Sequence, residues 1–140
     1  MTLSRAERDR LVFERAGGRC EYCRMHSALQ GATFHVEHTL PTARGGGDEL
    51  DNLALACPGC NLHKSSRVSL LDPVTGGSVP IFNLRSDCWS DHFAWDGERL
   101  VGLTALGRAL VEAFDLNHPR RRMIREAEAG FDLFPPPNPS

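Results

Sequence analysis

The chain has 140 residues, of which 41% are hydrophobic and 24% charged, values that are ordinary for a globular protein with one modest core. No apolar run approaches the length of a membrane span, and residues 2–15 are too charged for a signal peptide, so we expect no membrane helix and a cytoplasmic location. The formal net charge of −2 argues against a protein that binds nucleic acid through overall positive charge.

The first predicted element is a helix from about Ser4 to Ala16. The segment 4–7, Ser-Arg-Ala-Glu, fits a capping box, and two glycines end the helix just before the first cysteine. Residues 32–40 have no helical start signal and predict a strand. Its alternation places Phe34, Val36 and His38 on one face and His35 and Glu37 on the other.

That strand is expected to end in a loop at Pro41 and the glycines 45–47, and residues 52–55 predict a second short strand. Pro58 suits the first turn of a helix. This helix would carry Asn61, Lys64 and Arg67. The order strand, loop, strand, helix predicts an α+β fold with cysteines at both edges.

The second half of the chain predicts two more strands and two helices after a turn-rich connection at 71–77. The strands are expected at 79–84 and 98–103, on either side of the aromatic-rich stretch 89–95. The helices are expected from a Thr104 cap to about Leu116 and over about 118–129.

These elements predict three parts of the chain. Residues 1–70 form the core that carries the cysteines, and residues 71–130 form an extension packed on that core. The proline-rich tail 131–140 is expected to be extended or disordered.

Four of the five cysteines form two Cys-x-x-Cys pairs, Cys20 with Cys23 and Cys57 with Cys60. Two such pairs complete the tetrahedron that zinc prefers, and four thiolates leave no open position for water, so a zinc ion here would be structural. Unligated core cysteines and a redox protein are the alternatives, and the second is weak because neither pair lies in a βαβ pattern. Cys88 lies apart and is expected to be a small buried hydrophobe.

Polar residues of catalytic type lie between and just after the cysteine pairs. An imidazole such as that of His38 can take a proton from water near neutral pH. Glu37 offers a carboxylate, a hard ligand suited to Mg²⁺, and Asn61 offers a neutral oxygen to the same ion. Each signal is weak alone, since a histidine beside a glutamate is commonly a hydrogen-bonded surface pair, so the argument depends on their combination.

Four segments between residues 20 and about 67 carry that combination. They are His35-Val36-Glu37-His38-Thr39-Leu40-Pro41, the glycines 45–47, Asp51-Asn52-Leu53-Ala54-Leu55, and Cys57-Pro58-Gly59-Cys60-Asn61-Leu62-His63-Lys64. In order and spacing they closely resemble the HNH endonucleases, in particular the zinc-containing bacterial branch of that family. Residues 89–93 and 102–108 also resemble the C-terminal extension of small HNH proteins, with no catalytic role attached.

The resemblance implies a ββα-metal (His-Me finger) site that hydrolyses DNA phosphodiester bonds, by nicking or by double-strand cleavage. His38 matches the general base, Asn52 the residue that braces the loop holding the base, and Asn61 a metal ligand. Glu37 matches the acidic metal ligand, at a position where the family usually has aspartate. One divalent ion, Mg²⁺ or Mn²⁺, is implied beside the structural zinc.

Other charged residues are candidates for contacts with DNA. Lys64, the single lysine of the chain, together with Arg67 and Arg44, is a candidate for binding phosphates, with solvated surface charge as the alternative for the two arginines. His35 shares a strand face with Glu37, so an extra metal ligand, a phosphate contact and a structural role all remain open. The cluster of Arg120, Arg121, Arg122 and Arg125 is a candidate second phosphate-binding patch.

The rival interpretation is a catalytically weak zinc-ribbon module that binds nucleic acid. The near-neutral charge favours this module, whereas the presence of His38, Asn52 and Asn61 together favours the nuclease. The sequence leaves the oligomeric state open, although a double-strand break needs two nicking centres, which a dimer would supply.

Overall fold

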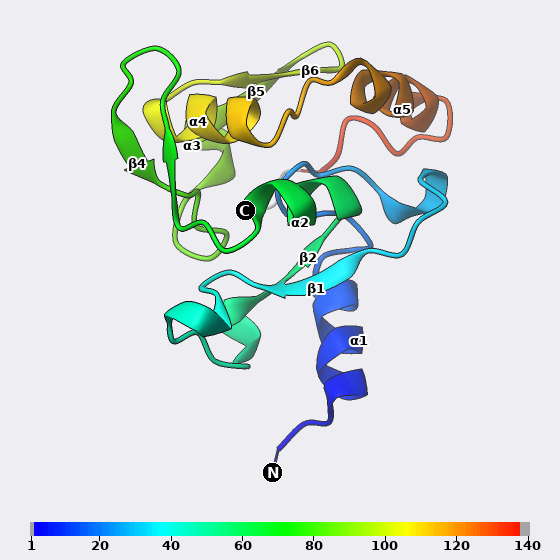
Figure 1. The fold of residues 1–140 in the computed structure, drawn as a ribbon. Coiled ribbons are helices and arrows are strands. Elements are labelled where there is room, and N and C mark those ends of the chain that lie inside the picture. The colour runs from blue at the N-terminus through cyan, green and yellow to red at the C-terminus, as the bar shows by residue number, and fades with distance from the viewer. Residues whose placement is uncertain (1, 138–140) are drawn as a thin grey trace. The chain divides into compact units, whose positions relative to one another are not determined.

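The computed structural model describes residues 2–137, so the end of the predicted tail, residues 138–140, lies outside the described residues. The chain divides into two compact units, Met1–Ser66 and Arg67–Ser140 (Figure 1). Both units combine helices with small two-stranded antiparallel sheets, and the predicted α+β class is confirmed. No helix within the described residues is long and apolar enough to cross a membrane.

The first unit begins with helix α1 (Arg5–Arg15), which starts at the predicted capping box. The Ser4 hydroxyl accepts a hydrogen bond from the Glu7 backbone N–H at 3.2 Å, and the Glu7 carboxylate accepts one from the Ser4 N–H at 2.8 Å. Gly17 and Gly18 follow the helix with φ of +64° and +71°, a conformation that favours glycine and turns the chain toward the first cysteine pair.

A two-stranded sheet follows, in which β1 (His35–His38) pairs with β2 (Leu53–Ala56) and His38 lies opposite Leu53. The first strand is shorter than the predicted span 32–40 because its partner has only four residues. A 3-10 turn precedes the partner strand and Cys57 caps a helix directly after it. Every residue of β2 is buried, so this strand forms the centre of the unit.

Helix α2 (Pro58–Lys64) begins at Pro58, as predicted, because a proline at the first helical position loses no internal hydrogen bond. The helix ends at Lys64, and Ser65 follows with a left-handed φ of +51°. Arg67 therefore lies outside the helix that was expected to carry it.

The second unit contains two hairpins and three helices. Strand β3 (Ser69–Leu71) pairs with β4 (Ser78–Pro80), and β5 (Phe93–Asp96) pairs with β6 (Arg99–Gly102). The helices are α3 (Trp89–His92), α4 (Ala105–Ala113) and α5 (Pro119–Ala129). The predicted Thr104 cap of α4 is present, since its side chain accepts a hydrogen bond from the Gly107 N–H.

Two predictions for this unit need correction. The strand expected at 79–84 ends at Pro80, and its partner is β3, whose last residue falls in the stretch read as a turn. The aromatic stretch 89–95 does not merely separate two strands. It forms α3 and most of β5, because Phe93 is buried and stacks edge-on against Phe82 at 5.3 Å.

Two side-chain predictions are also wrong. Cys88 is exposed rather than buried. Arg125 is completely buried: its guanidinium donates to the Leu116 carbonyl at 2.6 Å and lies 5.1 Å from the centre of the Trp95 ring. Arg122 is paired with Glu98 at 2.7 Å, so two of the four arginines of this cluster have partners inside the second unit and are not both available for the predicted phosphate patch.

Candidate metal centre and active site

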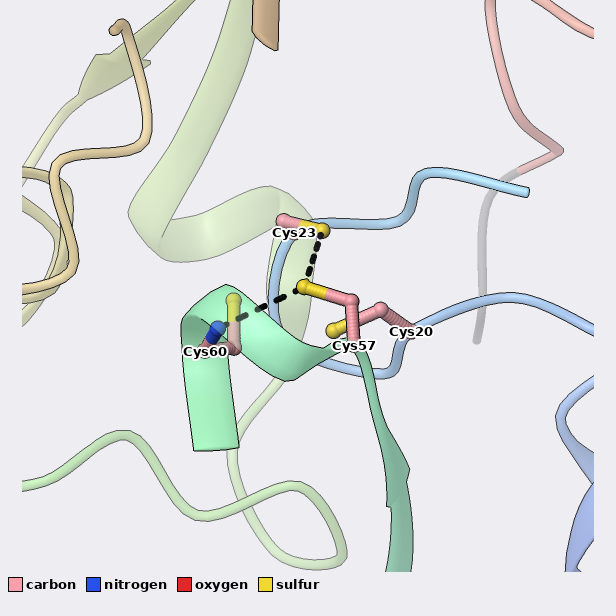
Figure 2. A group of neighbouring side chains, drawn as sticks. All are labelled: Cys20, Cys23, Cys57 and Cys60. Carbon is pink, nitrogen blue, oxygen red and sulfur yellow. Dashed lines mark hydrogen bonds between the residues drawn. The ribbon is translucent and has the colours of Figure 1, made fainter. Parts of the chain in front are cut away.

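The four paired cysteines converge on one point in the first unit (Figure 2). All four are buried, their sulfur atoms lie within 4.8 Å of one another, and the Sγ atoms of Cys23 and Cys57 are 3.8 Å apart. Within residues 2–137, no other group of three or more histidine, cysteine or acidic side chains brings its ligand atoms this close. Four sulfur donors in a closed, buried set fit a structural zinc ion, as the spacing predicted.

The thiols of this centre differ in how easily they lose a proton. Burial raises the pKa of Cys20 and of Cys60, whereas hydrogen bonds from the other thiols lower the pKa of Cys57. Cys57 also accepts a hydrogen bond from the Cys60 backbone N–H at 3.4 Å, in the first turn of α2. Zinc binds thiolates, so zinc binding at this centre must release the protons that the buried thiols carry.

The two residues inside the first pair attach the metal centre to the sheet. Glu21 exchanges two hydrogen bonds with Leu55 of β2, one from its backbone and one through its carboxylate. The Tyr22 hydroxyl donates to the Glu37 carboxylate of β1 at 2.6 Å. The cysteine spacing gave no signal for either contact, because residues at the two x positions of such a pair are unconstrained by the metal.

Glu37, the predicted acidic ligand, is only 8% exposed and is paired inside the unit. Its second oxygen lies 3.2 Å from the Lys64 ammonium group, which also donates to the His38 carbonyl at 3.1 Å. Burial raises the pKa of Glu37, and the hydrogen bond from Tyr22 and the charge of Lys64 act against that rise.

The same contacts correct the role predicted for Lys64. Its side chain is completely buried, and its ammonium group is bound by Glu37 and the His38 carbonyl of β1. In this structure Lys64 therefore does not present its charge to a phosphate. The helix places Lys64 three residues after Asn61, on the side that faces the strand.

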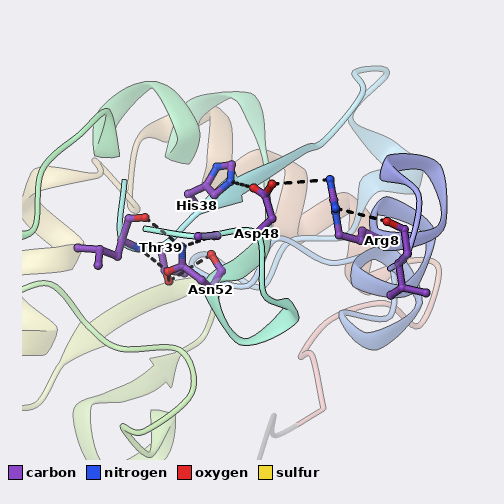
Figure 3. Close-up of polar contacts among 8 residues, drawn as sticks. Arg8, His38, Thr39, Asp48 and Asn52 are labelled. Carbon is purple, nitrogen blue, oxygen red and sulfur yellow. Dashed lines mark hydrogen bonds and ion pairs between the residues drawn. The ribbon is translucent and has the colours of Figure 1, made fainter. Parts of the chain in front are cut away.

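His38 is the last residue of β1, and its imidazole is part-exposed. The Nε2 atom lies 2.8 Å from the Asp48 carboxylate, whose other oxygen is 3.9 Å from the Arg8 guanidinium of α1 (Figure 3). The hydrogen bond with His38, followed by the charge of Arg8, lowers the pKa of Asp48. Sequence patterns missed both partners, since neither belongs to a periodic or spaced motif.

A hollow of about 460 Å³ opens beside this imidazole. Side chains of α1, β1 and the loop after β1 line it, including Arg5, Arg8, His35, His38 and Asp48. His35 therefore faces the same space as His38, although it is exposed and belongs to the opposite face of the strand pattern.

Asn52 ties together the loop that follows β1. Its side-chain oxygen accepts from the Leu40 N–H at 2.8 Å and the Thr39 hydroxyl at 2.7 Å, and its amide nitrogen donates to the carbonyls of Leu40 and Gly47 at 3.0 and 2.9 Å. The loop passes so close to itself that a Cβ atom on Gly46 would lie 1.7 Å from the Leu40 carbonyl oxygen. These bonds are of the kind expected for a residue that braces the loop.

The remaining candidates lie at different places in the first unit and just beyond it. Asn61 is half-buried in α2, and its backbone bonds to Cys57 and Ser65 continue the helix. Arg44 is exposed and its Nε donates to the Ser66 carbonyl at 3.2 Å. Arg67 is exposed in the segment after α2.

Comparison with known proteins gives one result that bears on this unit. The model of the family described as HNH endonuclease matches residues 20–67. Neither curated proteins nor solved structures give a significant match to the chain. The matched segment runs from the first cysteine pair through α2 and includes the whole sheet of the first unit. Residues 20–67 thus resemble the HNH endonuclease family, and the four-cysteine centre is compatible with the zinc-containing members of that family.

Proposed function

We propose that this protein is a metal-dependent endonuclease that hydrolyses DNA phosphodiester bonds with His38 as general base. An HNH domain indicates a nuclease or a nucleic-acid-binding function. The observation that favours the nuclease is the placement of His38: its imidazole borders the hollow, and a hydrogen bond to Asp48 holds it there. A general base must be within reach of the water that it activates, and a part-exposed ring beside an open hollow meets that condition.

The chemistry follows from this placement. His38 takes one proton from a water molecule, the water oxygen forms a bond to phosphorus, and the bond between phosphorus and the 3′ oxygen breaks. The 3′ oxygen takes up a proton from solvent as it leaves, and His38 gives its own proton back to solvent, so the products are a 5′ phosphate and a 3′ hydroxyl. Asn52 does not touch the reacting atoms in this scheme; it holds the loop after β1 so that His38 keeps its position.

Glu37 and Asn61 would hold the divalent ion, Mg²⁺ or Mn²⁺, which when bound supplies positive charge that stabilises the transition state. Each oxygen of Glu37 accepts one bond, from Tyr22 or from Lys64, and a carboxylate has about four acceptor positions, so capacity for an ion remains. The charge of Lys64 offsets that of Glu37, and we therefore expect weak ion binding without DNA. Substrate phosphates commonly complete a Mg²⁺ site.

DNA is the proposed partner. The protein would either nick one strand or cut both, and a dimer would be needed to cut both strands at once. Arg5, Arg44 and Arg67 are the arginines of this region proposed to contact the phosphate backbone. The proposed location is the cytoplasm, because a zinc centre of free thiols is favoured in a reducing compartment.

One contact favours a second candidate, a zinc-stabilised module that binds nucleic acid without cutting it. The Lys64 ammonium lies 3.2 Å from the Glu37 carboxylate, so a cation of the chain itself already balances the acidic ligand. If a divalent ion cannot bind Glu37 beside Lys64, the domain would bind nucleic acid but lack the metal charge that cleavage needs.

A plasmid assay separates these functions. Wild-type protein incubated with supercoiled plasmid and Mg²⁺ or Mn²⁺ should convert it to nicked or linear DNA. We expect His38→Ala to lose about 10²- to 10⁴-fold in rate, the usual contribution of a general base. His63→Ala, a histidine of the same domain that does not line the hollow, is the matched control. A wild-type protein that shifts DNA in a gel but nicks none under either metal would establish the binding module instead.

A further inference from the structure

We propose that Asp48 is a positioning residue for the base: it fixes which nitrogen of His38 carries the proton and thereby which nitrogen faces the water. This inference rests on the proposed function of His38. The ring nitrogen Nε2 lies 2.8 Å from the Asp48 Oδ1 atom. An ionised carboxylate only accepts hydrogen bonds, so Nε2 must be the donor and carry the hydrogen.

The other ring nitrogen then has its lone pair free. In neutral imidazole one nitrogen donates and the other accepts, so a proton held at Nε2 leaves Nδ1 as the acceptor. Nδ1 of His38 is thus the atom that takes the proton of the attacking water. After that transfer both nitrogens are protonated, and the Asp48 carboxylate remains beside the positive charge that has formed on the ring.

The fold holds Asp48 at this place from two directions. The Arg8 guanidinium of α1 lies 3.9 Å from the second carboxylate oxygen, so that oxygen is turned away from His38 and the first is presented to it. The backbone is anchored one residue earlier, where the amide nitrogen of Asn52 donates to the Gly47 carbonyl at 2.9 Å.

Asn52 therefore sets the spacing between His38 and Asp48. The same side chain binds Leu40, two residues after the base, and Gly47, one residue before the carboxylate. The Asn52 amide group therefore binds both ends of the loop, and the His38 imidazole and the Asp48 carboxylate lie within hydrogen-bond distance of each other. A residue that looks like a brace for one loop thus positions two members of the site.

The exposure of Asp48 to solvent limits how much this residue can contribute to the rate. The Asp48 side chain is 62% exposed, so its charge is screened by solvent and its main contribution is to the tautomer and orientation of the ring. We expect Asp48→Ala to lower kcat by about tenfold to a hundredfold, a part of the roughly 10²- to 10⁴-fold that a general base supplies, with KM for plasmid unchanged.

The test combines kinetics with ¹⁵N NMR of the histidine rings, in which the His38 signals are assigned by their loss in His38→Ala. Wild type should show His38 protonated at Nε2, and Asp48→Ala should shift it toward a mixture of both tautomers. Asp48→Asn keeps an acceptor oxygen and should retain the tautomer with a smaller loss of kcat. Asp51→Asn, which removes the same charge from an exposed position after the same loop, is the control.

A wild-type His38 protonated at Nδ1, or an Asp48→Ala protein with unchanged tautomer and kcat, would overturn the inference. The two proposals fail in different ways. If wild-type protein cleaves no DNA, the proposed function is lost, while the NMR comparison still decides whether Asp48 fixes the ring.

Discussion

The two units of this chain are stabilised by different means. The first unit has a sheet of two four-residue strands, and only one residue of α1 itself, Val12, is buried. Its interior holds apolar residues such as Tyr22, Met25 and Leu55, and it adds four cysteines and buried charged groups such as Glu37 and Lys64. A unit of this size rarely has enough apolar core to fold alone, and a metal is a common remedy.

The second unit relies on apolar and aromatic packing. Phe82, Phe93, Leu100, Leu110 and Phe114 are all buried in it. Two of its buried charged groups have identified partners: Asp72 accepts from Arg108 through both carboxylate oxygens, and Arg125 lies against Trp95. The two interiors thus differ in one respect: the unit with the candidate active site contains a four-cysteine set able to hold a metal ion, and the other unit contains no such set within the described residues.

The largest expected effect is the loss of zinc. Cys57→Ser, or treatment with a strong chelator, should unfold the first unit, because a structural zinc site supplies on the order of 10 kcal/mol of folding free energy. Both tryptophans, Trp89 and Trp95, belong to the second unit, so their fluorescence reports on that unit alone. Loss of dispersed amide signals from residues 5–64 with unchanged tryptophan fluorescence is the predicted result. Cys88→Ser, which changes the exposed cysteine, is the control.

A cavity made in the second unit should destabilise that unit and leave the zinc content of the first unit unchanged. Phe114→Ala should lower the free energy of unfolding of that unit by about 3–5 kcal/mol, because the ring is completely buried. Denaturant titration followed by tryptophan fluorescence measures this change, and zinc content should remain that of wild type. Phe131→Ala removes the same ring from a position that is 69% exposed and should change little. Zinc loss in Phe114→Ala would show that the units do not fold independently.

The smallest effect concerns charge in the second unit. Two hydrogen bonds from Arg108 lower the pKa of Asp72, so this pair adds stability above the ordinary aspartate pKa of about 3.9 and loses it as the pH falls below that value. Asp72→Asn should cost about 1–3 kcal/mol at pH 7 and reduce the loss of stability between pH 5 and 2. Unfolding curves at several pH values check this, with the exposed Asp96→Asn as control. An unchanged pH dependence would contradict the role of the pair.

Local sequence signals predicted much of the framework. The capping box placed α1, the proline placed the start of α2, and the cysteine spacing predicted a four-sulfur centre that the structure brings together. These succeed because each depends on residues close in sequence or on a metal with a fixed preference. The residues of β1 and β2 were found with boundaries that differ by a few positions, because strand length depends on the partner.

What could not be predicted depends on tertiary contacts. Lys64 was expected to bind phosphate, and its pairing with Glu37 exists only because α2 faces β1. Asp48 was overlooked, since it reaches His38 across a loop whose closure is set by Asn52. Arg125 was expected in a phosphate-binding patch, whereas it is buried inside the second unit, where it donates to carbonyl groups and lies against the Trp95 ring.

We propose that the metal centre supports the fold while His38 performs the chemistry. Zinc content and plasmid cleavage measured on the same preparation of His38→Ala test it most directly. The prediction is one zinc ion per chain, a circular dichroism spectrum like that of wild type, and cleavage reduced by about 10²- to 10⁴-fold. Cleavage at the wild-type rate, or zinc lost together with activity, would contradict the claim.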